Sequence, residues 1–226
     1  MKIWFVRHGN PNYAKDCLTE IGQKQAEATA VRMQDIHLDA IYSSGCGRAY
    51  ETALPTAQQR GMTVTRLPFL NEIAWGPKEK PYSYGHLWHT ADALARAGAD
   101  LLTYDYASHP ELGAHTCLWD HVARVTGGFD AFMETLGYVR EGKGYRCVRK
   151  NDDTLAIFSH KGASTCVFAH LAGVPVPYFA YFCSIYYASL TLVEFDAEVG
   201  GLLVPRFRVI NDYDHVKSIH PDLGEW

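Results

Sequence analysis

The sequence predicts an α/β fold, a three-layer sandwich in which a mostly parallel six-stranded sheet is flanked by helices. Short apolar runs of strand length alternate with segments of helical periodicity along the chain, as in successive strand–helix–strand units. The 226 residues, 47% hydrophobic and 20% charged, suffice for one domain with a large buried core. We therefore expect residues 1–226 to form a single domain.

The predicted strands share apolar, β-branched or aromatic composition and are bounded by turn residues. They span residues 2–6, 39–42, 63–70, 154–158, 188–195 and 202–210. The helices predicted between them span residues 19–36, 48–59 and 162–171. Thr19 is a favourable N-cap for the first of these helices. Pro55 is expected to bend or shorten the second.

The segment from residue 73 to residue 150 interrupts the alternation. It contains two further helical patterns, at residues 84–96 and 118–136. A segment this long between two strands usually carries function or shapes a pocket. We expect a helical insertion packed over one end of the sheet, not a second domain. Its aromatic residues either form a wall over a bound molecule or pack the insertion onto the sheet, and the sequence leaves both interpretations open.

Charge and hydropathy patterns argue against a nucleic-acid-binding protein, a membrane protein and a protein with a signal peptide. The net charge of -4 and the pI near 6.2 disfavour a nucleic-acid surface or an anionic-membrane surface. Only four apolar residues follow Lys2 before Arg7, too few for a signal peptide. The uncharged residues 171–193 are long enough to span a bilayer. Their glycine and prolines favour instead a helix end, a loop and a buried strand, and the aromatic run 178–187 is expected in the core.

The six cysteines are scattered along the chain, without a C-x-x-C pair or a compact metal-binding spacing. This distribution favours reduced and mostly buried thiols in a cytoplasmic protein. One disulfide remains an open alternative, and the sequence does not indicate an oligomeric state.

Residues of related chemistry follow four successive predicted strands. In chain order they are Arg7 with His8, then Arg48, then Glu72, and finally His160. In a parallel α/β sheet, ligands bind beyond the carboxyl ends of the strands. We therefore expect two arginines, two histidines and one glutamate to gather in a single crevice, at the end of the sheet that the insertion covers.

These residue types suit phosphoryl transfer. Arg7 and Arg48 offer planar, permanently charged groups that bind phosphate oxygens bidentately. A neutral His8 is a competent nucleophile if its other ring nitrogen donates to a fixed acceptor, such as a backbone carbonyl of the following turn. A protonated His160 would complete the positive cradle. Glu72 would protonate the leaving-group oxygen and later accept a proton from water.

With these residues in place, the chain resembles the histidine phosphatase superfamily, also called the phosphoglycerate mutase-like family. Arg7-His8-Gly9 is similar to its motif after the first strand. The other matches, in order along the chain, are residues 18–26 (LTEIGQKQA), 42–53 (YSSGCGRAYETA), 70–76 (LNEIAWG), 159–162 (SHKG) and 211–215 (NDYDH). The resemblance implies a phosphoglycerate mutase-like fold, a phosphohistidine at His8, and no metal or other cofactor.

The chain departs from the family pattern beside the predicted site. Asn10 stands where Glu or Gln is common, Gly45-Cys46 replaces Pro-Leu, and Lys161 replaces a small residue next to His160. Residues that flank the nucleophile help to line the leaving-group pocket, so these departures bear on the substrate. Asn10 and Asn12 are candidate donors to phosphate oxygens, although Asn10 also suits a turn. Lys161 is a candidate for an additional phosphate contact.

The leading hypothesis is a metal-independent, histidine acid phosphatase-type phosphomonoesterase that acts on a small phosphorylated metabolite, with neither nucleic acid nor membrane as partner. A phosphomutase is the first alternative, weakened because RHGNPNY and NEIAWG differ from the mutase motifs RHGESxWN and ERxYG. A non-catalytic phosphate-binding protein is the second. His86 and His89 have a spacing that suits a metal, but a solvent-facing pair is favoured without a third ligand.

Overall fold

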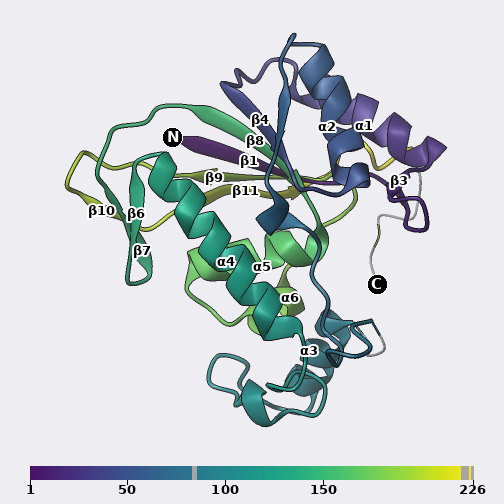
Figure 1. Ribbon diagram of the computed structural model, residues 1–226, viewed down its shortest axis with the longest axis vertical. Helices are drawn as coiled ribbons and strands as arrows, with labels where there is room; N and C mark the ends of the chain where they lie inside the picture. The colour runs from purple at the N-terminus through teal and green to yellow at the C-terminus, as the bar shows by residue number, and fades with distance from the viewer. Residues whose placement is uncertain (83–85, 220–223, 225–226) are drawn as a thin grey trace.

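A six-stranded sheet lies at the centre of the computed structural model, which describes residues 1–82, 86–219 and 224 (Figure 1). The strand order is β11-β9-β1-β8-β4-β5. In that order the strands are Arg206–Asp212, Leu190–Glu194, Lys2–Arg7, Thr154–Ser159, Ala40–Ser43 and Val64–Arg66. Only β9 is antiparallel to its neighbours in this sheet, so the other five strands run in one direction. The predicted mostly parallel six-stranded sheet is confirmed.

Helices cover both faces of the sheet, which completes the predicted three layers (Figure 1). Two helices, α1 (Glu20–Met33) and α2 (Gly47–Gln58), lie on one side. Three helices lie on the other: α4 (Leu118–Thr135), α5 (Lys161–Ala172) and α6 (Val176–Phe182). Thr19 caps α1, because its Oγ1 accepts a hydrogen bond from the Gly22 amide at 3.1 Å. Helix α2 continues through Pro55, so the expected shortening does not occur.

The central strands β1 and β8 are buried on both faces, as their near-continuous apolar sequences require. Trp4 and Val6 of β1 pack with α1 and α2, together with Ala156 and Phe158 of β8. Alternate residues of the same two strands, among them Phe5, pack with α4 and α5 in the larger core cluster. The period of two residues along a strand therefore divides the side chains between two cores.

Two predicted strands are interrupted at prolines. The predicted strand 63–70 ends as β5 at Arg66, and a 3₁₀ helix, η1 (Pro68–Leu70), follows it. The predicted strand 202–210 is two strands, β10 (Leu202–Leu203) and β11, which belong to different sheets on either side of Pro205. Proline has no N–H to give to a ladder, which accounts for both breaks.

Several elements lie outside the predicted set. The hairpin of β6 (Tyr138–Glu141) and β7 (Gly144–Cys147) forms a second sheet with β10. Helix α6 replaces part of the loop and strand expected over residues 171–193. The remaining short elements are β2 (Pro11–Asn12), β3 (Cys17–Leu18) and the 3₁₀ helix η2 (Tyr106–Ser108).

The segment 73–150 contributes to more than one part of the fold. Its helix α3 (Leu87–Arg96) contacts α6, whereas α4 contacts α5, η1 and β6 as part of a flanking layer. Much of the segment therefore belongs to the main architecture. Its interpretation as an insertion, and that of the whole chain as one domain, stay predictions.

All six cysteines are free, and four of them are buried. Among the residues that the structure describes, no single helix is long and apolar enough to cross a membrane. Helices α5 and α6 meet the length and composition requirements only together, and the pair is bent by 110° at its break.

Two adjacent glycines in α4 provide a test of how closely this helix packs on η1. A Cβ added at Gly128 would lie 2.5 Å from Cβ and Cγ of Phe69, whereas one at Gly127 would have nothing within 4 Å. We expect Gly127→Ala to raise the free energy of unfolding by about 0.5–1 kcal/mol through helix propensity. Gly128→Ala should lower it by about 1–3 kcal/mol through overpacking. Urea denaturation of both variants measures the difference, and effects of the same sign would contradict the packing described here.

Candidate active site

The pairing of β1 with β8 brings the two histidine-containing segments, Arg7-His8 and Ser159-His160, to the same end of the sheet. Arg7 pairs with Ser159 in the parallel register, and the His8 amide donates to the Ser159 carbonyl at 2.9 Å. His8 and His160 therefore leave the sheet side by side, with ring centroids 5.1 Å apart. Both rings are almost completely buried.

Hydrogen bonding fixes the protonation of the His8 ring. Its Nδ1 lies 2.7 Å from the carbonyl oxygen of Gly9, and because a carbonyl only accepts, Nδ1 carries the proton. The lone pair is then on Nε2, which lies 3.4 Å from Nε of Arg48. Burial, reinforced by Arg7 and Arg48, holds the pKa of His8 well below its usual 6.5. His8 is consequently a neutral imidazole at pH 7, with its lone pair directed at the cationic side of the site.

His160 occupies the N-cap position of α5, where its Nε2 lies 2.7 Å from Oγ of Ser44. Burial, followed by the influence of His8 and Arg48, holds the pKa of His160 well below 6.5. The protonated His160 expected from the sequence is therefore not the state that this arrangement favours. A dianionic phosphoryl group beside the ring would act in the opposite direction and raise the pKa.

Arg7 is anchored by backbone carbonyls from distant parts of the chain. Its Nη1 donates to Ile185 O at 2.6 Å and to Gly224 O at 3.1 Å. The guanidinium also lies 4.0 Å from the ring centroid of Tyr187, a favourable cation–π distance. Tyr187 is buried, as predicted for the run 178–187, and its ring centroid lies 5.7 Å from that of His8. Within the same run, Phe182 is exposed instead, so only part of the run belongs to the core.

Arg48 is oriented by an acidic residue that the sequence did not indicate. Asp16 Oδ1 forms an ion pair with Arg48 Nη1 at 2.5 Å, and Asp16 Oδ2 accepts from the Gly47 amide at 2.7 Å. The carboxylate therefore binds both the N-terminus of α2 and the arginine next to it. A left-handed backbone at Asp16, with φ of 48°, is tolerated by aspartate. It lies in a loop between motifs, so no pattern pointed to it.

Glu72 is held at the N-terminus of α5. Its Oε1 accepts from the amides of Ile73 and Ala163, both at 2.9 Å, and Oε2 accepts from the Gly162 amide at 3.3 Å. Arg124 of α4 donates to the Glu72 carbonyl at 3.3 Å. Both the side chain and the backbone of Glu72 are thus fixed before any ligand is bound.

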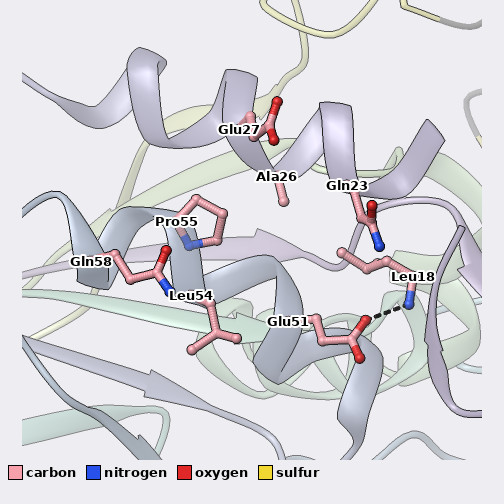
Figure 2. Close-up of a pocket in the computed structure, with 8 residues that line it drawn as sticks. All are labelled: Leu18, Gln23, Ala26, Glu27, Glu51, Leu54, Pro55 and Gln58. Atoms are coloured by element: carbon pink, nitrogen blue, oxygen red, sulfur yellow. Dashed lines mark hydrogen bonds between the residues drawn. The ribbon is translucent and has the colours of Figure 1, made fainter. Parts of the chain in front are cut away.

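Arg7, Arg48 and Glu72 border a cavity of about 700 Å³, within the range of small-molecule sites, whereas His8 and His160 are buried behind its lining. It is lined by Arg7, Tyr13, Arg48, Glu72, Ile73, Trp75, Tyr82, His86, Trp88 and Lys161. A second hollow of about 250 Å³ lies between α1 and α2, where Figure 2 shows two carboxylates, Glu27 and Glu51, and no cationic side chain. Its charge opposes binding of a phosphate, so the large cavity is the candidate active site.

Local contacts hold Asn10 and Asn12, the candidate donors to phosphate oxygens, and their contact with phosphate stays a prediction. Asn10 accepts a hydrogen bond from Thr19 Oγ1 through its side-chain oxygen, at 2.8 Å. Asn12 Oδ1 accepts from the Lys15 amide at 3.2 Å. Neither asparagine lines the cavity, and local loop contacts account for both side chains, in agreement with the turn interpretation of Asn10.

Lys161, His86 and His89 differ in whether they line the cavity. Lys161 lines the cavity, and its Nζ lies 4.1 Å from the ring centroid of Trp88. His86 does not simply face solvent as predicted: its ring stacks on Trp88, with centroids 5.0 Å apart, and lines the cavity. His89 is exposed. Within the described parts of the chain, no group of three or more metal-ligating side chains is present.

Comparison with known proteins agrees with the geometry. The model of the histidine phosphatase superfamily (branch 1) matches residues 3–205. The chain belongs to this superfamily. The adenosylcobalamin/alpha-ribazole phosphatase of Escherichia coli (strain K12) is 24% identical over 189 residues, covering 77% of this chain and 81% of that protein.

Solved structures of the superfamily share the fold. A mycobacterial glucosyl-3-phosphoglycerate phosphatase matches with a TM-score of 0.63 and 23% identity, over 93% of this chain and 98% of that one. The phosphoserine phosphatase of Entamoeba histolytica, in complex with 3-phosphoglyceric acid, matches with a TM-score of 0.64 and 19% identity, over 95% and 98% of the two chains. At these identities, both below 25%, the two structures show that the fold is shared.

The neutral state of the buried histidines has a consequence for stability. Below pH 6.5 the unfolded chain binds a proton at His160 that the folded protein does not bind, because the folded pKa is lowered. The free energy of unfolding should therefore fall as the pH drops below 6.5, by up to about 1.4 kcal/mol per pH unit for each such histidine. We expect His160→Gln to reduce this slope by about that amount. Denaturation between pH 5 and 7 measures it, and an unchanged slope would contradict a neutral His160.

Proposed function

We propose that this protein is a phosphatase that hydrolyses a small phosphomonoester through a phosphohistidine on His8, without a metal ion. The observation that carries the proposal is the hydrogen bond from His8 Nδ1 to the Gly9 carbonyl. It leaves Nε2 unprotonated beside the guanidinium of Arg48, so that a nucleophilic lone pair and the groups that bind phosphate oxygens face the same point.

In the first step, His8 Nε2 attacks phosphorus and the bond from phosphorus to the leaving-group oxygen breaks. Glu72, in its protonated form, gives its proton to that oxygen, which departs as an alcohol. The ring then carries positive charge, which the Gly9 carbonyl stabilises through Nδ1–H. In the second step, water attacks phosphorus, the N–P bond breaks with its electron pair returning to Nε2, and the water proton passes to Glu72. The net change is hydrolysis of the ester to an alcohol and phosphate.

Electrostatic stabilisation of the transferred group would come from Arg7, Arg48 and His160. The two guanidinium groups are held in place by the Ile185 carbonyl and by Asp16, respectively, so little reorganisation is needed when negative charge develops on the equatorial oxygens. Binding of the phosphate would draw Arg48 away from Nε2 of His8 and would favour protonation of His160. Lys161 lines the cavity and supplies a further positive charge.

The named relatives support hydrolysis over phosphoryl transfer to a second substrate. Each is called a phosphatase, and their names refer to small phosphorylated metabolites. A small phosphorylated metabolite is accordingly the class of substrate that we propose for this chain. The complete set of groups around His8 also favours turnover over mere binding of phosphate.

Replacement of the nucleophile tests the mechanism. We expect His8→Ala to lower the rate of phosphate release from phosphomonoesters below about one-thousandth of wild type, with EDTA present throughout. His37→Ala is the control, because the His37 side chain is 83% exposed and lies outside the cavity lining. Trapping of acid-labile, base-stable phosphate on the wild-type protein alone would accompany this result. Hydrolysis at a near-wild-type rate by His8→Ala would overturn the mechanism.

Replacement of the proton donor should depend on the leaving group. Loss of a positioned general acid costs about 100- to 10,000-fold, so Glu72→Gln should fall in this range with alkyl phosphates. Activated aryl phosphates need less protonation and should be affected least. Glu79→Gln, an exposed carboxylate in the same segment, is the matched control. Equal losses for alkyl and aryl phosphates would remove Glu72 from the position of proton donor.

A further inference from the structure

Apart from its charged groups, the lining of the active-site cavity is largely aromatic. Tyr13, Trp75, Tyr82 and Trp88 all border it, together with the imidazole of His86. We refer to Trp75, Tyr82, His86 and Trp88 as the aromatic wall. These rings come from a chain segment that follows Glu72 directly, so the wall begins next to the group proposed to protonate the leaving-group oxygen.

The aromatic wall is a connected and fixed cluster. Trp75 is buried at its centre, with ring centroids 6.3 Å from Tyr82, 5.3 Å from His86 and 5.5 Å from Trp88. His86 and Trp88 are stacked, with an interplanar angle of 8°, and Lys161 lies over the Trp88 ring. The Trp75, His86 and Trp88 rings hold one another in place, and therefore little conformational entropy is lost when a ligand binds against them.

Packing against the core does not account for all of the rings that border the cavity. Tyr82 is 69% exposed and Tyr13 is 57% exposed, yet both line the same cavity. Rings that serve the core are buried, as Trp75 is, and single exposed rings elsewhere on a surface need no explanation. The Tyr13 ring lies 5.3 Å from the Arg48 guanidinium. Two exposed rings that border one concave site beside Arg7 and Arg48 indicate a surface for a ligand.

The charge of the cavity decides which ligand suits these rings. An aromatic surface also binds quaternary ammonium groups through cation–π attraction. Among the described residues, however, Arg7, Arg48 and Lys161 line the cavity with one carboxylate, Glu72, and Asp16 pairs with Arg48 from outside the lining, so positive charge remains in excess. Burial, with His89 and Lys161, lowers the pKa of His86, which leaves that ring neutral. A cationic leaving group would meet excess positive charge, whereas a neutral or anionic one would not.

We infer that the leaving group of the substrate is an alcohol or phenol that carries a planar aromatic or heteroaromatic ring, neutral or anionic, bound against Tyr82 and Tyr13. This inference rests on the proposed phosphatase function for the position of the phosphoryl group. It adds that the non-phosphate part of the substrate is recognised by ring contacts. The phosphate ester of a small polyol or of an ammonium alcohol is accordingly expected to be a poor substrate.

Binding of non-hydrolysable phosphonates tests the inference without turnover. (2-Naphthylmethyl)phosphonate and its saturated decahydro counterpart have the same carbon skeleton and the same phosphonate. Calorimetric titration should show the naphthyl ligand binding about 3- to 10-fold more tightly, because aromatic pairs add to the burial of apolar area. A second isosteric pair, 2-(trimethylammonio)ethylphosphonate and 3,3-dimethylbutylphosphonate, should favour the neutral member. Equal affinities in the first pair, or a preference for the cation in the second, would overturn the inference.

Substitutions then locate the preference. Tyr13→Leu combined with Tyr82→Leu keeps apolar bulk but removes both rings, and should bring the affinity ratio of the naphthyl and decahydro ligands close to one. Tyr181→Leu is the matched control, because Tyr181 is also exposed, at 46%, but lies on α6 outside the cavity lining. A ratio that persists in the double variant would place recognition elsewhere and contradict the inference.

Failure of this inference is separable from failure of the proposed function. Acetyl phosphate is an activated phosphoryl donor without a ring, and its hydrolysis by wild type but not by His8→Ala tests the phosphatase alone. Hydrolysis of acetyl phosphate with no preference for the naphthyl ligand refutes the ring-bearing leaving group and leaves the phosphatase. A naphthyl preference with no His8-dependent hydrolysis refutes the phosphatase and leaves an aromatic binding surface.

Discussion

The register of β1 against β8 is the constraint on which the site depends. Because Arg7 stands opposite Ser159, the residues that follow the two strands, His8 and His160, emerge side by side, with ring centroids 5.1 Å apart. A slip of one residue would exchange the two faces of β1 and send alternate side chains into the wrong core. The division of apolar residues between the two cores therefore fixes the positions of the histidines as firmly as it stabilises the sheet.

A cost accompanies this assembly, because the sheet end holds several positive or potentially positive groups away from water. Desolvation accounts for the lowered pKa values of Arg7, His8 and His160. Carboxylates at Asp16 and Glu72 offset part of the charge. The positive charge that remains creates an electrostatic field in the cavity, and a dianionic phosphoryl group would neutralise it. The same charges that destabilise the free protein would therefore favour a transition state in which negative charge grows.

The sequence predicted those parts of the molecule that local chemistry determines. Arginine and histidine after successive strands followed from the rule that ligands bind at the carboxyl ends of strands, and the sheet followed from apolar periodicity. Contacts between distant loops could not be predicted, because nothing local distinguishes Asp16 as the partner of Arg48 or Tyr187 as the partner of Arg7. The strand breaks at Pro68 and Pro205 could have been predicted from the sequence, since each proline lacks the N–H that a continuous strand requires.

Anchoring of Arg7 by the carbonyl of Ile185, 178 residues later in the chain, has a consequence during protein synthesis. At roughly 5–20 residues per second, about 9–36 s separate the appearance of the two partners on the ribosome. For most of that interval the apolar strand β1 has no β8 to pair with, and β9 follows Ile185 in the chain. The first strand therefore stays without its partners for much of synthesis, and Arg7 cannot acquire its anchored geometry before Ile185 has been made.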